Sequence, residues 1–186
     1  MMGRVTLDAL RVIRAAVGLA GFFLVACGRR DAGSDWTLQV DTVQTGAASG
    51  NRVTASLRAS GKEGPEGEAA THAVALSLDC FGDNATVAIM TDQALRQGST
   101  DVRMSVDGGP SRKVKGFAGT TKTGGKVVLQ IAQDTLLARL SGHRHAVLHY
   151  ADGAGSYKTT AEFPIAGLDR QGAAFLAVCG RRGGKR

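Results

Sequence analysis

The stretch HAVALSLDC, residues 72–80, decides the fold that we expect for this chain. Apolar side chains stand at every second position of it: Val74, Leu76, Leu78 and Cys80. Side chains at alternate positions lie on one face of a β-strand, so this spacing predicts a strand with one buried face. The cysteine that ends the pattern is expected to face the core as well.

The same alternation recurs along most of the chain after Trp36. It occurs in WTLQVDTVQ (36–44), NRVTASLRA (51–59), ATVAIMT (85–91), DVRMSV (101–106), RKVKGFA (112–118), KVVLQI (126–131), HAVLHYA (145–151) and YKTTAEF (157–163). Turn-forming residues separate several of these segments, as in DGGP (107–110) and DGAGS (152–156). We therefore expect a mainly β domain, an antiparallel β-sandwich or partly open barrel of about nine short strands.

The apolar spacing changes to a helical period in two places, residues 132–140 and residues 168–179. Gly142 follows the first segment, and Pro164 and Gly180 bound the second, as is typical of helix ends. We expect one or two short helices. Their apolar faces contain Ala132, Leu136, Leu137 and Leu140 in the first, and Leu168, Gly172, Phe175, Leu176 and Cys179 in the second.

The first residues of the chain predict export from the cytoplasm. MMGRVTLDALRVIR is positively charged, and the apolar run AAVGLAGFFLVA (15–26) follows it. A helix of that length spans about 18 Å, well short of the ~30 Å hydrocarbon core of a bilayer. The run is therefore typical of a signal peptide rather than of a transmembrane helix.

The junction LVAC (24–27) resembles the lipobox of bacterial lipoproteins. The resemblance implies that the chain is cut just before Cys27 and that acyl chains on this cysteine anchor the protein in a membrane. The alternative is an ordinary secretory signal in which Cys27 has no such role. Gly28, rather than Asp, follows the cysteine, which favours the outer membrane over the inner membrane.

These features predict four parts of the chain. They are a lipoprotein signal peptide (1–26), a lipidated cysteine with a short tether (27–35), a single β-rich domain (36–180) and a basic tail (181–186). Residues 28–35 reach at most about 28 Å when fully extended, so we expect the domain to face the periplasm close to its membrane.

Cys80 and Cys179 remain as a pair once Cys27 is set aside. In an oxidising compartment such a pair favours a disulfide. The rival interpretation is a metal-binding or nucleophilic pair, but no cluster of His or acidic residues stands beside either cysteine. We predict a disulfide that joins the C-terminal helix to the 72–80 strand, closing a loop of about 100 residues that the chain-entropy model values at ~4.7 kcal/mol.

The net charge of +7 is concentrated at the ends of the chain, in residues 1–30 and in the tail RRGGKR (181–186). Acidic and basic residues nearly balance between residues 31 and 180. Proteins that bind nucleic acid need a basic face or groove. We therefore expect no nucleic-acid partner.

Motifs for catalysis or cofactor binding are weak in this sequence. GTTKTGGK (119–126) departs from a phosphate-binding loop at Gly125, joins two expected strands and is interpreted as a hairpin turn. His143, His145 and His149 share a strand face, and an H-x-H pair such as His143 and His145 can chelate zinc or copper. Residues four apart on a strand lie ~13 Å apart, so His149 cannot join that pair, and no acidic or thiol ligand lies nearby in the sequence. We expect no metal, no cofactor and no enzymatic activity.

The segment SGKEGPEGEAAT, residues 60–71, has no apolar pattern and is interpreted as an exposed hairpin loop or flap. Its acidic residues, Glu63, Glu66 and Glu68, are candidates for contact with a partner.

From about Val74 to Cys179, the order of features resembles the type VI secretion-associated TagO/VasI family. The resemblance is carried by a leading Trp36, LSLDC ending at Cys80, VRMSVDGGP around Asp107, and EFPIAGLDRQGAAFLAVC (162–179). The family often has Arg two residues before the Asp, where this chain has Ser105, with Arg103 two residues further back. The resemblance implies an envelope accessory protein without known catalysis, with Arg103 and Asp107 as candidate partner-binding residues.

Two functional hypotheses remain open on the sequence, beside a third option, a purely structural envelope protein. The first is a non-enzymatic lipoprotein that binds another envelope protein through strand edges or through residues 60–71, in support of a secretion machine. The second is a ligand-binding or inhibitor lipoprotein that places acidic loop residues in the cleft of a cationic lysozyme. In both, the membrane is a partner through the lipid on Cys27.

Overall fold

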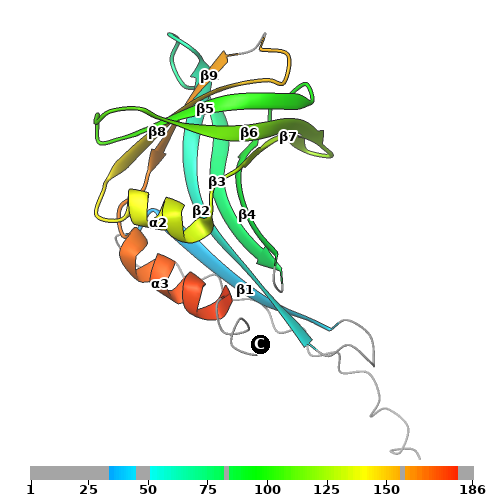
Figure 1. Ribbon diagram of the computed structural model, residues 1–186, viewed down its shortest axis with the longest axis vertical. Coiled ribbons are helices and arrows are strands. Elements are labelled where there is room, and N and C mark those ends of the chain that lie inside the picture. Colours follow the sequence, from blue (N-terminus) through cyan, green and yellow to red (C-terminus); the bar gives the residue numbers. More distant parts are fainter. Residues whose placement is uncertain (1–33, 45–50, 82–83, 156–157, 180–186) are drawn as a thin grey trace, which may run out of the picture.

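The computed structural model describes residues 34–44, 51–81, 84–155 and 158–179, and these residues form nine strands and two helices (Figure 1). The strands are β1 (Trp36–Gln44), β2 (Asn51–Pro65), β3 (His72–Phe81), β4 (Asn84–Thr91), β5 (Gly98–Val106), β6 (Arg112–Thr121), β7 (Gly124–Leu129), β8 (His145–Ala151) and β9 (Lys158–Pro164). The helices are α2 (Gln133–Leu140) and α3 (Leu168–Cys179).

The strands form one antiparallel sheet in the order β1-β2-β3-β4-β7-β6-β5-β8-β9, and β2 also pairs with β9. This second pairing closes β2 to β9 into an eight-stranded barrel and leaves β1 outside it. The predicted mainly β fold is confirmed, and of the two architectures proposed the barrel is the observed one. The barrel is closed rather than partly open.

The length of β2 makes this closure possible. Its first part pairs with β1 as far as Ala59, and its last part pairs with β9 from Lys62 onward. Gly61 lies at the change of partner, where a Cβ atom would stand only 2.2 Å from the backbone oxygen of Glu162. A glycine is therefore required for β2 and β9 to approach so closely.

The prediction of an exposed loop over residues 60–71 is wrong for residues 60–65. β2 continues to Pro65, and the turn to β3 occupies only the residues that follow. The apolar pattern breaks there because the inward positions on this part of β2 hold Gly61 and Glu63 instead of large apolar side chains.

One end of the barrel, which we call the helix end, is covered by α2 and α3 (Figure 1). The side chain of Gln133 at the start of α2 donates hydrogen bonds to the backbone oxygens of Asp79 (2.8 Å) and Thr86 (3.2 Å). Phe175 of α3 is fully buried in the core. Leu176 is 39% exposed, so its predicted place in the buried stripe of the second helix is wrong.

The predicted disulfide between Cys80 and Cys179 is confirmed. It joins β3 to the last residue of α3, with 6.1 Å between the two Cα atoms. The bond ties the C-terminal helix to the wall of the barrel, which is the packing role that the sequence predicted.

No helix among the described residues is long and apolar enough to cross a membrane.

Candidate functional site

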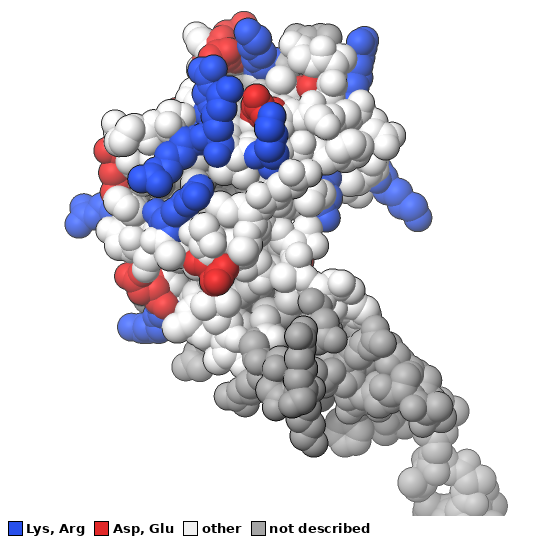
Figure 2. Space-filling model, in the orientation of Figure 1, with Lys and Arg blue, Asp and Glu red and all other residues white. Residues whose placement is uncertain are grey.

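The outer surface of β5 and β6 carries a concentration of positive charge. Arg103 on β5 lies directly opposite Lys113 on β6, and Asp101 lies directly opposite Lys115. Figure 2 shows Lys and Arg side chains gathered on the side of the barrel where β5, β6 and β8 lie in Figure 1. Acidic and basic residues nearly balance over residues 31–180, but the basic residues are unevenly distributed over the surface of the barrel.

Arg103, one of the predicted partner-binding residues, is exposed at the centre of this surface. Its other neighbour across the sheet is His149 of β8. The ring of His149 is hydrogen-bonded to the Thr160 hydroxyl of β9 at 3.0 Å. Arg103 is exposed, and no carboxylate among the described residues forms an ion pair with it, whereas the ring of the neighbouring His149 is hydrogen-bonded.

Asp107, the second residue singled out by the family resemblance, is held by internal contacts. It lies at the β5–β6 turn with a φ of 46°, in the left-handed region that Asp tolerates better than most residues. Its carboxylate accepts hydrogen bonds from the backbone amides of Arg144 (3.1 Å) and His145 (2.8 Å) and pairs with the His143 ring (2.9 Å). The structure gives Asp107 the role of joining this turn to the start of β8.

These contacts lower the pKa of Asp107 from its ordinary value. The hydrogen bond with His143 is the largest cause, and the backbone bond from His145 is the next. Because they favour the charged form, the carboxylate stays ionised through mildly acidic conditions.

The predicted acidic residues separate into two groups. Glu66 and Glu68 are exposed in the turn between β2 and β3, and the backbone amide of Glu66 donates to the oxygen of Lys158 at 3.0 Å. Glu63 has no exposed surface at all. The prediction that Glu63 lies on an exposed loop is therefore wrong.

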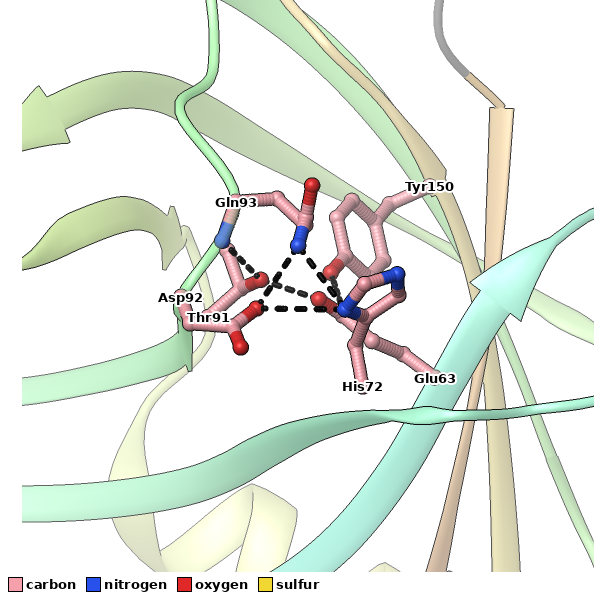
Figure 3. Close-up of polar contacts among 6 residues, drawn as sticks. All are labelled: Glu63, His72, Thr91, Asp92, Gln93 and Tyr150. Carbon is pink, nitrogen blue, oxygen red and sulfur yellow. Dashed lines mark hydrogen bonds and ion pairs between the residues drawn. The ribbon is translucent and has the colours of Figure 1, made fainter.

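Glu63 points into the barrel at the end opposite the helices, which we call the polar end (Figure 3). The hydroxyl of Thr91 on β4 donates to one carboxylate oxygen, and the hydroxyl of Tyr150 on β8 donates to the other. The Thr91 hydroxyl in turn accepts the backbone amide of Gln93 at 3.0 Å. One carboxyl group thereby links three strands that are far apart in the sequence.

A second layer of polar side chains lies beside this carboxyl group (Figure 3). The Gln93 amide nitrogen donates to the His72 ring (3.0 Å) and to Asp92 (2.9 Å). His72 and Asp92 are partly exposed, with 3.9 Å between the ring nitrogen and the carboxylate oxygen. These residues connect the buried carboxyl group to the surface of the barrel.

Burial raises the pKa of Glu63 from its ordinary value, and the nearby charge of Asp92 acts in the same direction. The two hydroxyl donors and His72 oppose this rise because they favour the charged form. With both oxygens engaged and no exposed surface, Glu63 bonds strands together rather than meeting a partner.

The sequence contained a signal for this inward position that the loop interpretation missed. Ala55, Leu57, Ala59 and Gly61 precede Glu63 at steps of two, and the first three are buried. Side chains two positions apart share one face of a strand, so extending this pattern from Gly61 by two residues places Glu63 on the inner face of the barrel. Thr91 follows Val87 and Ile89 at steps of two, and Tyr150 follows Ala146 and Leu148 in the same way, so both also carry this signal. The sequence does not show that they meet Glu63, because that contact depends on strands that are distant in the sequence.

β1 is the strand that differs most from the others. Within the described ranges it pairs with β2 alone, so one of its edges carries no sheet partner. The Trp36 amide donates to the Ser34 hydroxyl at 3.1 Å instead of to a strand. Because amides alternate in direction along a strand, those of Leu38 and Val40 are expected to point toward the same open edge. Val40 is 38% exposed there.

A groove of about 670 Å³ lies where β2 changes partner from β1 to β9. No predicted site residue lines it. Its walls are formed by Ser60, Gly61, Lys62, His145, Ala146, Val147, Glu162, Phe163 and Pro164.

The three clustered histidines do not converge. His143 bonds Asp107 in the loop before β8, His149 bonds Thr160, and His145 begins β8. Among the described residues, no three His, Cys, Asp or Glu side chains are placed to hold a metal ion. Cys27, the predicted lipidation site, lies outside the described residues.

No family model matches the chain, and no curated protein matches it. Among solved structures, the chain is similar to invasion-associated protein B from Bartonella henselae, with 13% sequence identity and a TM-score of 0.49 over 80% of this chain and 96% of that chain.

Proposed function

We propose that the protein is a membrane-anchored envelope lipoprotein that binds another envelope protein and has no catalytic role of its own. Its place would be that of an accessory factor, and the family resemblance suggests a type VI secretion apparatus as the assembly it serves. The lipobox-like junction at Cys27 supports the anchor.

The unpaired edge of β1 is the observation that carries this proposal. Among the described residues, each of the eight barrel strands has a strand neighbour on both sides, whereas β1 pairs with β2 alone. β1 lies outside the barrel and extends from Trp36 to Gln44. An extended segment of a partner can add to such an edge by backbone hydrogen bonds, with side-chain contacts giving specificity.

The test is cross-linking in intact envelopes followed by recovery of the full-length protein with its bound partners. Val40→Pro removes an amide that faces the open edge, whereas Val40→Thr keeps that amide and the β-branched shape. We expect Val40→Pro to lose the partner and Val40→Thr to keep it. Cys27→Ala is expected to lose the partner through mislocalisation.

Recovery of secretion-apparatus subunits by the parent protein and by Val40→Thr, but not by Val40→Pro, would support the proposal. Equal recovery by Val40→Pro and Val40→Thr would contradict pairing at this edge. Equal recovery with Cys27→Ala would contradict the anchored role.

A second candidate function, inhibition of a cationic lysozyme, is favoured by the exposed turn that holds Glu66 and Glu68. Both side chains project at the polar end of the barrel, where a turn of this kind could enter a basic cleft. Assays with a purified lysozyme would detect inhibition, and Glu66→Lys should abolish it. No inhibition by the parent protein would remove this candidate.

A further inference from the structure

The outer surface of β5 and β6 holds charges in an arrangement that costs stability. We call the group of Arg103, Lys113, Lys115 and Phe117 the basic face. Arg103 and Lys113 lie directly opposite each other on neighbouring strands. Like charges in that position repel, since their side chains share one face of the sheet. The sheet therefore bears a repulsion that a bound anion would relieve.

One acidic residue partly neutralises the basic face. Asp101 accepts a hydrogen bond from Lys115 at 2.7 Å, and Lys113 lies 3.6 Å from its other carboxylate oxygen. The bond from Lys115 is the main reason that the pKa of Asp101 is lowered, so this carboxylate stays charged. Neither lysine is buried by these contacts, because their side chains are 67% and 72% exposed. Exposed pairs of this kind hold their partners weakly.

Arg103 has no such partner. Among the described residues, no carboxylate forms an ion pair with its guanidinium group. Its neighbours in register are Lys113 on one side and His149 on the other. A guanidinium group flanked by basic side chains is well placed to bind a phosphate group, which accepts its forked hydrogen bonds.

An exposed aromatic residue adjoins these cations. Phe117 follows Lys113 and Lys115 at steps of two along β6, and it is 43% exposed. Its partner across the sheet in β7 is Val128, which is itself only partly buried. Basic residues next to an exposed apolar side chain are typical of surfaces that lie in the headgroup region of a bilayer.

We propose that the basic face rests on an anionic lipid bilayer and orients the barrel on its membrane. Phosphate groups of the lipids contact Arg103 and Lys113, and Phe117 lies against the headgroup layer. The face lies on the outside of the barrel, and its four side chains are exposed to whatever surface lies beside it. This inference rests on the proposed lipid anchor, since a tether of about 28 Å keeps the membrane always within reach.

The test uses the full lipidated protein in vesicles, with Phe117→Trp as a probe of depth. Brominated lipids quench a tryptophan that touches the bilayer, whereas the native Trp36 is fully buried and gives a constant background. We expect strong quenching in an equal mixture of phosphatidylcholine and phosphatidylglycerol, and weak quenching in phosphatidylcholine alone. High salt should reduce the signal, because it screens exposed charges.

Charge reversal tests which residues hold the face on the bilayer. Arg103→Glu combined with Lys113→Glu should lower the equilibrium constant for docking roughly tenfold or more, given the usual attraction of each cation to an anionic surface. Arg58→Glu is the control, because Arg58 is exposed on β2, four strands away from β6 in the barrel. It should leave the quenching unchanged.

The outcomes separate this inference from the proposed function. Protein that fails to stay with either type of vesicle would contradict the lipid anchor itself. Protein that is anchored but equally quenched in both lipid mixtures, or unaffected by the double reversal, would overturn the inference. Loss of the cross-linked partner on Arg103→Glu, without any change in quenching, would show instead that the face binds an acidic protein.

Discussion

The two ends of the barrel are held together by different forces. At the helix end, α2 and α3 cover the barrel, apolar side chains such as Phe175 are fully buried, and a disulfide joins Cys80 to Cys179. At the polar end, the carboxyl group of Glu63 accepts hydrogen bonds from Thr91 and Tyr150. The contrast shows that one small domain can join its strands through helices and a disulfide at one end and through a buried acid at the other.

This difference has a consequence for how the two ends respond to change. Apolar burial and a covalent bond are insensitive to pH, whereas a buried carboxyl group is a titrating part of the structure. The helix end should therefore be sensitive to reduction and to loss of volume. The polar end should be sensitive to pH and to loss of a hydrogen-bond acceptor.

Removal of the disulfide is the largest expected perturbation. Replacing Cys80 and Cys179 by alanine opens a loop in which the two residues are 99 positions apart. Disulfides that close long loops in small exported domains stabilise them by about 2–5 kcal/mol. Urea unfolding of the double variant, compared with the parent protein with and without a reductant, measures this cost. A loss below about 1 kcal/mol would mean that α3 is held mainly by packing.

Replacement of Glu63 tests the polar end. Glu63→Ala leaves the Thr91 and Tyr150 hydroxyls without their acceptor and opens space in the interior, which should cost about 2–4 kcal/mol. Glu63→Gln keeps one acceptor oxygen and should cost less. Glu66→Ala, three residues along and exposed, is the matched control and should change stability by less than about 0.5 kcal/mol.

Equal unfolding free energies for Glu63→Ala and the parent protein would contradict a structural role of this carboxyl group.

The helix end could be predicted from the sequence largely because its interactions follow a local period. Val74, Leu76, Leu78 and Cys80 alternate along β3, which reaches the helix end at Cys80, and all four are buried. The helical spacing of Leu136, Leu137 and Leu140 also holds. The disulfide joins two such patterns, so residue type and compartment sufficed to predict it.

The polar end could not be predicted in this way. Glu63 and Tyr150 are 87 positions apart, and nothing local in either segment indicates the other. The basic face was missed for a related reason. Arg103 and Lys113 become neighbours only through the pairing of β5 with β6. A net charge summed along the chain gives no information about which charged residues lie next to one another.

Trp36→Phe tests a smaller contact at the start of β1. The Trp36 indole donates to the backbone oxygen of Ile165 at 3.0 Å, and the side chain is fully buried. Phenylalanine keeps most of the apolar volume but leaves that oxygen without its donor. The expected loss is about 1 kcal/mol, smaller than that of Glu63→Ala, and thermal unfolding would detect it. No change would indicate that this oxygen finds another donor.

The smallest expected effect is on the pH dependence of stability, and it has opposite signs at Glu63 and Asp107. Burial raises the pKa of Glu63 above its ordinary value of 4.5, so the folded state binds more protons than the unfolded chain. The contribution of Glu63 to the free energy of unfolding is therefore fully present below pH 4.5, and it is lost as the pH rises through the folded-state pKa. Glu63→Gln should remove this decline.

At Asp107 the sign is reversed, because the His143 ring and the backbone amides lower its pKa below the ordinary value of 3.8. Its contribution is present above that value and is lost as the pH falls through the folded-state pKa. The free energy of unfolding can be measured as a function of pH between acidic and neutral conditions. Glu63→Gln should make this free energy less dependent on pH toward neutral pH, and Asp107→Asn should make it less dependent on pH toward acidic pH. If both variants altered the same side, the buried acid would not titrate as its surroundings require. The polar end would then resemble the helix end in its response to pH.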